Sequence, residues 1–263
     1  MKSPVIVIGI GEMGSVFARG LLRLGHPVYP VTRGTDMTAL AQRLPAPELV
    51  LVAVAEDSLR DVLENLPQAW HNRAALLQNE LLPRDWESYG LIHPTVISVW
   101  FEKKRGQDVK VLIPSPVFGP QAQLLHDCLA QLAIPARMLA SSEELLFELV
   151  VKNVYILTVN CAGLMTGGTV SMLWSQHRAL ADAVAREVIE IQQRLTGRTF
   201  EADELIRAML VAFAGDPEHQ CTGRSAAARL QRAIGQADTA GLAVPELRRI
   251  AASTTLQRHS ASA

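Results

Sequence analysis

The feature that most constrains this chain is a glycine-rich turn placed directly after an apolar run near its start. The run Val5–Ile8 leads into Gly9-Ile10-Gly11-Glu12-Met13-Gly14, and a helical pattern continues to Leu24. In such a strand–turn–helix the first glycine permits the tight turn, the second lets the backbone approach a pyrophosphate, and the third allows close helix–strand packing. The helix N-terminus attracts the anion. The segment predicts a dinucleotide-binding βαβ unit whose turn, including Glu12 and Met13, binds the cofactor; the alternative is a glycine-rich turn of another α/β protein.

The residues after the second apolar run predict which dinucleotide is bound. An acidic residue here would accept hydrogen bonds from the ribose 2′-hydroxyl of NAD, but Val28–Val31 runs into Thr32-Arg33-Gly34. Arg33 offers a permanently charged fork that matches a 2′-phosphate, and Thr32 offers a hydroxyl donor. We therefore predict NADP as the cofactor. In the alternative, Arg33 is a solvated loop residue and Asp36 binds the ribose.

The first half of the chain alternates short β-branched runs with helical patterns, which is the signature of a parallel sheet with crossover helices. The runs are apolar on both faces, as expected where helices cover both sides of a sheet. Strands are predicted at Val5–Ile8, Val28–Val31, Leu49–Val54, Ala75–Leu77, Val96–Phe101, Val109–Ile113 and Ala136–Leu139. Helices are predicted at Met13–Leu24, Met37–Arg43, Leu59–Leu66 and Gln121–Leu132. This half reads as a doubly wound α/β Rossmann domain with a mostly parallel sheet.

The second half reads as all helical. A capping hydroxyl and acidic residues in Ser141-Ser142-Glu143-Glu144 mark a helix start, and no strand pattern recurs after it. Helices are predicted at Glu143–Leu164, Val170–Leu195, Ala202–Ala214, Ser225–Ala240 and Pro245–Leu256, and fraying is expected at Arg258–Ala263. The change of periodicity predicts two domains, a cofactor-binding domain over residues 1–140 and a helical substrate or dimerisation domain over residues 141–263.

Composition excludes several classes of partner. Of the 263 residues 49% are hydrophobic, 19% are charged, and the formal net charge is −1. The longest basic block, Lys103-Lys104-Arg105, reads as a solvated strand end and gives no field for nucleic acid or acidic lipid. Apolar runs such as Leu145–Leu157 are interrupted by charge and fall short of the roughly 20 residues of a membrane span. We predict neither a nucleic-acid nor a membrane partner.

The cysteines and histidines give no sign of a disulfide framework or a metal site. Cys128, Cys161 and Cys221 are odd in number, widely spaced and without a CxxC pair. Histidines such as His177 and His219 have no ligand or triad spacing. With no secretory signal pattern at the N-terminus, a reducing, cytoplasmic location is predicted, without a metal.

Four features together resemble the ketopantoate reductase (2-dehydropantoate 2-reductase) family of the 6-phosphogluconate-dehydrogenase-like superfamily. They are the opening glycines, Gln78-Asn79 at a strand end, Lys152 with Asn160 on one long predicted helix, and Gly241-Leu242-Ala243-Val244-Pro245. Their order and spacing cover most of the chain. The resemblance implies an N-terminal Rossmann domain, an all-helical C-terminal domain and reduction of a 2-oxo acid with NADPH.

The resemblance also implies roles for three residues. Lys152 is then the catalytic lysine, Asn79 lies beside the nicotinamide ribose and the substrate, and Asn160 contacts the substrate. Such a lysine can assist at the carbonyl oxygen as hydride arrives. Lys152 and Asn160 are about two helical turns apart, so they project from roughly one face. The alternative for Lys152 is a snorkelling side chain on an amphipathic helix.

Three departures from the family pattern bear on the substrate. The family lysine after the third strand is replaced by Ala55-Glu56-Asp57, and its Gln/His-Asn-Gly motif ends here in Glu80. The family's Thr-Glu-x-Asp stretch, whose glutamate binds the substrate hydroxyl, has no counterpart, and the nearest segment is Gly223–Leu230. Within it, Ser225 is able to bind a hydroxyl, and Arg224 either binds a carboxylate or begins a surface helix.

The sequence therefore predicts an NADPH-dependent reductase of a small 2-oxo acid, with Lys152 assisting at the carbonyl oxygen. One alternative is a β-hydroxyacid dehydrogenase, because the opening Gly-Ile-Gly-Glu-Met-Gly is similar to that group's and it too uses a helix lysine. The other is a non-catalytic NADP-binding or sensor protein, motivated by the missing glutamate. The identity of the acid, the direction of flux and a homodimer are left open.

Overall fold

The computed structural model describes residues 2–260, with side chains for residues 2–254. The chain divides into two compact units, Met1–Leu149 and Val150–Ala263, called here the sheet unit and the helical unit. The division falls inside helix α6 (Ser142–Thr166), which begins two residues after residue 140, where the periodicity of the sequence changes.

The sheet unit is built on a seven-stranded sheet whose strands follow the order β2-β1-β3-β4-β5-β8-β9. Its strands are β1 (Val5–Ile8), β2 (Val28–Val31), β3 (Leu49–Val52), β4 (Ala74–Leu76), β5 (Thr95–Ile97), β8 (Ser115–Phe118) and β9 (Ala136–Met138). Strands β1 to β5 are parallel to one another, β8 runs antiparallel to β5, and β9 is parallel to β8. The doubly wound, mostly parallel sheet predicted from the sequence is confirmed.

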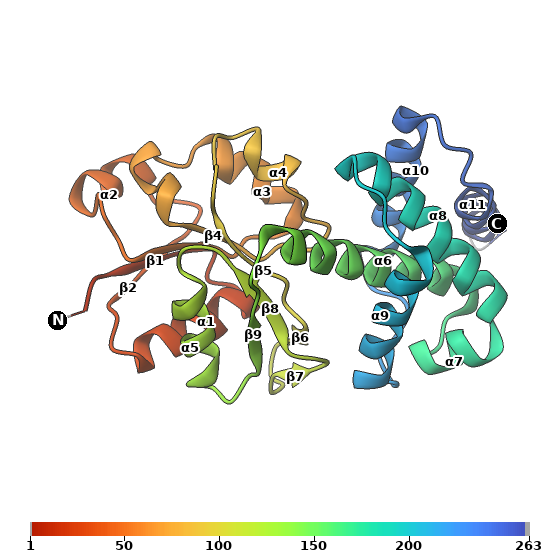
Figure 1. Ribbon diagram of the computed structural model, residues 1–263, viewed down its shortest axis with the longest axis horizontal. Coiled ribbons are helices and arrows are strands. Elements are labelled where there is room, and N and C mark those ends of the chain that lie inside the picture. The colour runs from red at the N-terminus through yellow and green to blue at the C-terminus, as the bar shows by residue number, and fades with distance from the viewer. Residues whose placement is uncertain (1, 261–263) are drawn as a thin grey trace. The chain divides into compact units, whose positions relative to one another are not determined.

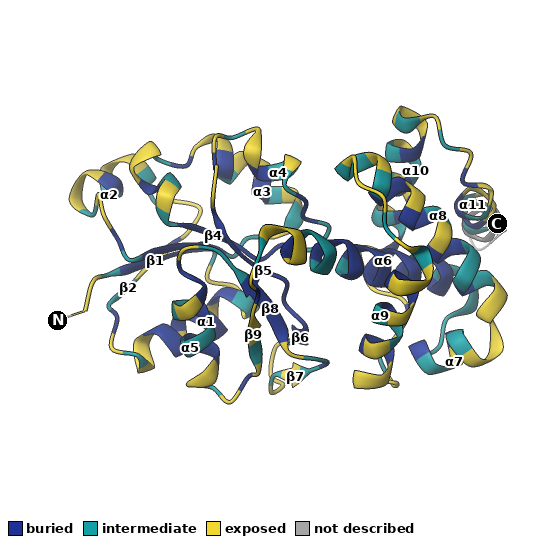
Figure 2. Ribbon diagram, viewed as in Figure 1, coloured by how far each residue is buried: buried dark blue, intermediate teal, exposed yellow. Residues whose placement is uncertain are grey.

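Helices cover both faces of this sheet (Figure 1). One face carries α1 (Glu12–Arg23) and α5 (Ala122–Ala130), and the other carries α2 (Met37–Arg43), α3 (Glu56–Glu64) and α4 (Arg84–Glu87), with a 3₁₀ turn at Gln68–Arg73. The central strands are buried along their length (Figure 2). Helices α1 and α5 pack so closely that a Cβ on Gly20 would lie 2.3 Å from the Cys128 carbonyl oxygen.

A small hairpin, β6 (Phe101–Glu102) and β7 (Lys110–Val111), stands apart from the main sheet. Phe101 packs against Phe17 of α1 with 6.2 Å between ring centroids, and both belong to the core under α1 and α5. The hairpin is therefore fixed to the same helix that begins at the glycine turn.

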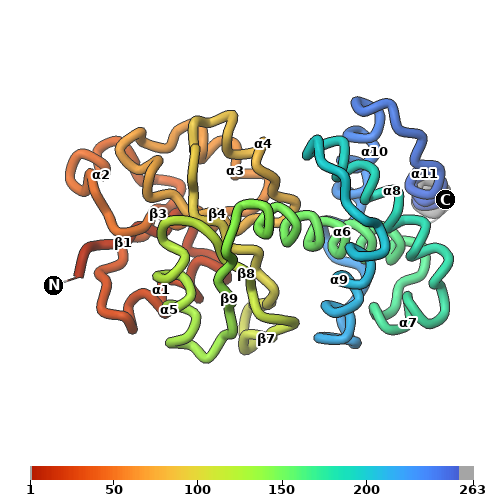
Figure 3. The backbone as a smooth tube through the Cα atoms, viewed as in Figure 1, coloured from red at the N-terminus to blue at the C-terminus, as the bar shows by residue number. Residues whose placement is uncertain are grey.

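The helical unit continues from α6 through α7 (Val170–Gln176), α8 (Arg178–Thr196), α9 (Ala202–Gly215), α10 (Ala226–Ala240) and α11 (Pro245–Ser260). Figure 3 follows the backbone through these helices. Helix α8 contacts α7, α9, α10 and α11, so it forms the centre of the packing. A buried hydrogen bond from Asn153 Nδ2 to Gln192 Oε1 (2.9 Å) joins α6 to α8.

Helix α6 is long and apolar enough to pass a test for a membrane span, and 78% of the stretch that passes is buried in the structure. Burial of this kind is what the core helix of a soluble protein shows, because its apolar surface is already covered by protein. Helix α6 is therefore a core helix.

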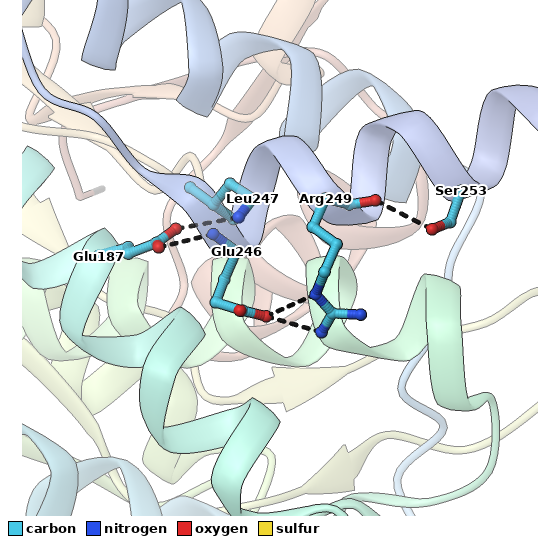
Figure 4. Close-up of polar contacts among 5 residues, drawn as sticks. All are labelled: Glu187, Glu246, Leu247, Arg249 and Ser253. Carbon is cyan, nitrogen blue, oxygen red and sulfur yellow. Dashed lines mark hydrogen bonds and ion pairs between the residues drawn. The ribbon is translucent and has the colours of Figure 1, made fainter.

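The last helix is capped by a carboxylate from another helix (Figure 4). The oxygens of Glu187 on α8 accept the backbone N–H groups of Glu246 (2.7 Å) and Leu247 (2.9 Å). Pro245 opens the helix without an N–H of its own, which suits the first helical position. The cap satisfies donors that helix geometry leaves without an intrahelical partner. Helix α11 continues to Ser260, and residues 261–263 of the segment expected to fray lie outside the described residues.

Several elements of the sheet unit differ from the sequence prediction. Helix α4 and the 3₁₀ turn Gln68–Arg73 were not predicted, and the predicted strand Val109–Ile113 is reduced to β7 in the separate hairpin. The predicted strand Val96–Phe101 is divided between β5 and β6, because the Trp100 N–H donates to the Ser115 hydroxyl (2.9 Å) where the strand leaves the sheet. Strand β8 was not predicted, since Pro114 and Pro116 flank and interrupt its run and lack the N–H that a ladder needs. In the sheet Pro116 acts as an acceptor, with its carbonyl bound by the Ser98 N–H at 2.9 Å.

One helix of the helical unit also differs. The predicted helix Val170–Leu195 is two helices, separated at His177, whose backbone leaves the helical region at φ −128° and ψ 32°. Neither glycine nor proline marks this break. Instead Val170 and Ser171 donate their N–H groups to the carbonyls of His219 and Pro217, which fixes the start of α7 independently of α8.

Candidate functional site

The glycine turn between β1 and α1 has the geometry that a Rossmann nucleotide turn requires. Gly9 has φ +91°, and a Cβ on it would lie 2.8 Å from the Ala53 carbonyl oxygen. A Cβ on Gly14 would lie 1.9 Å from the Gly9 carbonyl oxygen, so only glycine allows α1 to sit this close to the turn. Both positions exclude side chains for reasons internal to the fold.

Gly11 differs from the other two glycines, because a Cβ on it would meet nothing within 4 Å. It forms the N-cap of α1 in an extended conformation, and no side chain caps the helix there. The first backbone N–H groups of the helix therefore face an open approach, where they suit an anion. Bare backbone beside open space fits the pyrophosphate of a dinucleotide.

The end of β2 forms a short polar turn. Thr35 donates its N–H to the Thr32 carbonyl (3.0 Å), and the Thr32 N–H donates to the Thr35 hydroxyl (3.0 Å). Arg33 is exposed on this turn and forms no ion pair within the part of the chain that the structure describes. Asp36 is the N-cap of α2, and its Oδ1 accepts the Ala39 N–H at 3.0 Å.

The end of β4 is held by a buried glutamine. Gln78 Nε2 donates to the carbonyls of Val52 (2.8 Å) and Val54 (3.2 Å), so the ends of β3 and β4 are tied together. The next residue, Asn79, is partly buried. Glu80 then takes a left-handed conformation with φ 59°, which is rare for a residue with a side chain. Glu80 therefore has a backbone shape that glycine adopts more easily.

These three segments lie at one edge of the sheet. Strands β2, β1, β3 and β4 are adjacent and parallel, so the residues after each strand emerge at their carboxyl ends. The glycine turn, the turn carrying Thr32 and Arg33, and Asn79 therefore share the edge at which open α/β sheets bind ligands.

A separate groove of about 690 Å³ occurs at the opposite edge of the sheet. It is lined mainly by apolar side chains, among them Trp86, Phe118 and Leu145, and by His93 just before β5. Phe118 ends the antiparallel strand β8, which places the groove at the amino ends of the parallel strands. It is not part of the candidate cofactor site.

Lys152 lies on α6 in the helical unit. Its side chain is partly buried, and its Nζ stands 5.7 Å from the ring centroid of Tyr155. Tyr155 packs edge-on against Phe213 (5.7 Å) and near His219 (6.0 Å), so an aromatic cluster supports the lysine stem. A partly desolvated ammonium against an aromatic face is restricted in position compared with a solvated lysine.

Asn160, two turns further along α6, is buried and bound by an arginine that the sequence prediction did not include. Arg229 Nη1 on α10 donates to Asn160 Oδ1 at 2.9 Å. The two residues are 69 positions apart, and no local pattern connects them. Arg224 and Ser225, which the sequence offered for this region, are exposed just before α10 begins.

The cysteines have the character of core residues. Cys128, Cys161 and Cys221 are free and buried. Burial raises the pKa of Cys128 to about 12 and that of Cys221 to about 11, because the thiolate would lose its hydration. In the described residues no group of three or more His, Cys, Asp or Glu side chains is placed to hold a metal ion.

Sheet topology and glycine geometry together define the class of this fold, a Rossmann-type sheet unit followed by an all-helical unit. Solved structures extend this likeness over nearly the whole chain. The 2-dehydropantoate 2-reductase of Methylococcus capsulatus is similar with a TM-score of 0.70 and 13% identity, over 99% of this chain and 98% of that one. The dimeric ketopantoate reductase of Staphylococcus aureus has a TM-score of 0.63 and 14% identity, over 98% and 99%.

A second kind of enzyme shares the fold. D-mandelate dehydrogenase, solved with NADH and anilino(oxo)acetate, has a TM-score of 0.65 and 13% identity, over 98% of this chain and 100% of that one. No family model matches the sequence, and no curated protein matches it. The predicted resemblance to ketopantoate reductases is thus confirmed at the level of the fold.

Proposed function

We propose that this protein is an NADPH-dependent reductase of a small 2-oxo acid, a divergent enzyme of the ketopantoate reductase type. The observation that carries the proposal is the glycine turn, where Gly9 and Gly14 leave no room for a side chain and Gly11 faces open space. The likeness in fold to the solved 2-dehydropantoate 2-reductase and D-mandelate dehydrogenase supports it. In this proposal the sheet unit binds the cofactor and the helical unit supplies substrate-binding residues.

NADP is favoured over NAD by the charges at the end of β2. Arg33 is exposed and available to a 2′-phosphate, which it would bind as a planar fork. Asp36, the acidic residue that would suit the ribose of NAD, already caps α2 through Oδ1. Thr32 contacts Thr35 across the same turn and presents a hydroxyl beside Arg33.

Lys152 is proposed as the group that assists at the substrate carbonyl. When bound, the nicotinamide supplies the hydride. Lys152 donates a hydrogen bond or proton to the oxygen that becomes the alcohol, which lowers the free energy of the developing negative charge. The packing around Tyr155 holds the lysine stem, so that the ammonium is positioned before the reaction begins.

Arg229 and Asn160 are proposed to bind the substrate carboxylate. A guanidinium has five N–H donors in a fixed fork, and one of them is directed to Asn160 Oδ1. The asparagine orients the fork, and carboxylates are the anions that such a fork matches in geometry. Asn79 would contact the nicotinamide ribose. This assignment selects acids over neutral carbonyl compounds.

The remaining parts of the proposal concern location and assembly. Three free, buried cysteines suit a reducing compartment, and we propose a cytoplasmic enzyme. A homodimer is proposed by analogy with the ketopantoate reductase of Staphylococcus aureus, whose structure is described as dimeric.

The function is tested in two steps on the full chain. A thermal-shift comparison of NADPH, NADP and NADH should show stabilisation that is largest for the phosphorylated forms, because a ligand that binds only the native state raises the melting temperature. NADPH oxidation is then measured against a panel of 2-oxo acids that includes ketopantoate and an aromatic 2-oxo acid.

Each outcome separates two hypotheses. Turnover of a 2-oxo acid supports the reductase, and the preferred side chain identifies the substrate. Binding of NADPH without turnover of any 2-oxo acid would favour a sensor protein, and absence of any shift with all three nucleotides would refute the proposed cofactor site.

A further inference from the structure

Acidic residues open two neighbouring helices at the edge of the sheet that carries the glycine turn. Glu12 lies in the first turn of α1, and Glu56 and Asp57 open α3 at the end of the neighbouring strand β3. A dinucleotide brings the two negative charges of its pyrophosphate to this edge. Like charges at short range repel, so the site needs a cation beyond the partial charge of the helix N-terminus.

Lys103 is the cation that the structure places beside this turn. It follows β6, and its Nζ lies 3.7 Å from Glu12 Oε2. The same ammonium donates to the carbonyl of Lys104 at 3.0 Å and to the carbonyl of Gln107, so the hairpin turn holds it in place. Its side chain is 20% exposed, in contrast to the solvated strand end expected for the basic run.

The neighbouring lysine shows what an ordinary surface position looks like in this hairpin. Lys104 is 64% exposed, and its Nζ pairs with Glu102 Oε2 at 3.1 Å. It has no contact with Glu12 among the described residues. The two adjacent lysines therefore have equal charge but differ in their contact with the glycine turn.

The position of Lys103 is fixed by the packing of its hairpin on the core. Phe101, two residues earlier, packs on Phe17 of α1, so hairpin and helix move as parts of one packed body. An ammonium has three N–H donors, and two of them are used by the carbonyls of the turn. The distance to Glu12 exceeds that of a hydrogen bond, which makes the contact an ion pair that a phosphate oxygen can replace.

We propose that Lys103 binds the pyrophosphate of the dinucleotide and offsets the charge of Glu12. The proposal rests on the proposed cofactor site and adds a residue to it. The residues after β3, Ala55-Glu56-Asp57, carry no positive charge. Lys103 supplies the cation instead. Because both NADPH and NADH carry the same pyrophosphate, Lys103 serves both, whereas Arg33 serves only the 2′-phosphate.

The test compares Lys103→Gln with the matched control Lys104→Gln in direct titrations of the full chain with NADPH and NADH. Lys103→Gln should weaken both nucleotides by a similar factor of about 10 to 100, the range for a charged hydrogen bond. Lys104→Gln should change either affinity less than about 2-fold, as expected of an exposed pair. Lys103→Arg should retain most of the affinity.

A double variant separates phosphate binding from simple neutralisation of Glu12. If Lys103 only neutralises Glu12, Glu12→Gln combined with Lys103→Gln would restore wild-type affinity, and the proposal is overturned. If Lys103 binds phosphate, the double variant stays weak. Equal losses for Lys103→Gln and Lys104→Gln, or a loss confined to NADPH, would also overturn it. A wild-type chain that binds neither nucleotide would instead refute the cofactor site itself.

Discussion

The glycine turn of the sheet unit and the polar residues of the helical unit are held in place in different ways. At the turn, the shape is set by backbone atoms, since a Cβ on Gly14 would lie 1.9 Å from the Gly9 carbonyl oxygen. In the helical unit, Asn160 is oriented by a side chain from another helix, Arg229, at 2.9 Å. The shape of the glycine turn depends on the absence of side chains at its glycines. The geometry of the helical unit's polar residues depends on which side chains are present.

This contrast predicts that the glycine turn tolerates sequence change around it better than the side-chain pairs of the helical unit do. A site made of backbone atoms is expected to keep its shape when surrounding side chains change, as long as its glycines are kept. A site made of side-chain pairs can exchange both partners while the helices stay where they are. The helical unit is therefore where a change of substrate is expected, and four predictions test the comparison.

The largest effect is expected at Lys152. Lys152→Met keeps the apolar stem against Tyr155 but removes the ammonium, so turnover on the active 2-oxo acid should fall by about 10²–10⁴-fold while NADPH affinity changes little. Lys152→Gln should be nearly as poor, because an amide cannot supply a proton. Steady-state kinetics and NADPH titration measure both quantities. Near wild-type turnover for Lys152→Gln would contradict the catalytic assignment.

The next effect separates two glycines of the same turn. Gly14→Val should lower the free energy of unfolding by about 3 kcal/mol or more, because its Cβ would overlap the Gly9 carbonyl. Gly11→Val should melt close to wild type yet lose the NADPH-induced shift, because its side chain fills the open space beside α1. Thermal melts with and without NADPH measure both. A normal NADPH shift for Gly11→Val would place the dinucleotide elsewhere.

A smaller effect is expected at Arg33. Arg33→Ala should weaken NADPH by about 1.5–3 kcal/mol, the range for a charged hydrogen bond, and leave NADH nearly unchanged. Isothermal titration with both cofactors makes the comparison, and Arg43, an exposed arginine in the last turn of α2, provides a matched Arg43→Ala control. Equal losses of affinity for NADPH and NADH would contradict the assignment of Arg33 to the 2′-phosphate.

The smallest effect concerns Glu80, whose backbone is left-handed. Glu80→Gly should raise the free energy of unfolding by up to about 1 kcal/mol, since the relief of the left-handed strain slightly exceeds the entropy that glycine adds to the unfolded chain. Glu80→Ala removes the same charge but keeps a Cβ, so it separates backbone strain from electrostatics. Denaturant titration would detect the difference, and an equal rise for both variants would assign it to charge.

Most of the fold could be predicted from periodicity and turn chemistry. Strands β1 and β2 and helix α2 begin and end at the predicted residues, because short apolar runs and a capping aspartate mark them. Strand β8 could not be predicted, because its pairing depends on partners such as Ser98 rather than on its own residues. The break at His177 could not be predicted either, since neither glycine nor proline marks it and its local sequence is compatible with a continuous helix.

The residues of the candidate site also divide into those that local sequence predicts and those that depend on distant partners. The glycine turn and the Thr32-Arg33 segment follow from motif and position, because they are adjacent in sequence and occur at strand ends. Arg229 could not be predicted, since its partner Asn160 is 69 residues away. Lys103 was hidden in a basic run that reads as surface, and only the packing of its hairpin on α1 distinguishes it from Lys104.

The cap that Glu187 forms on α11 has a consequence for biosynthesis. The backbone N–H groups that it binds belong to Glu246 and Leu247, so the carboxylate on α8 receives these partners only when the end of the chain has been made. By then the last strand of the main sheet, β9, has long left the ribosome. A premature stop before Pro245 would therefore spare every strand of the sheet unit, while it removes the element that completes the helical unit.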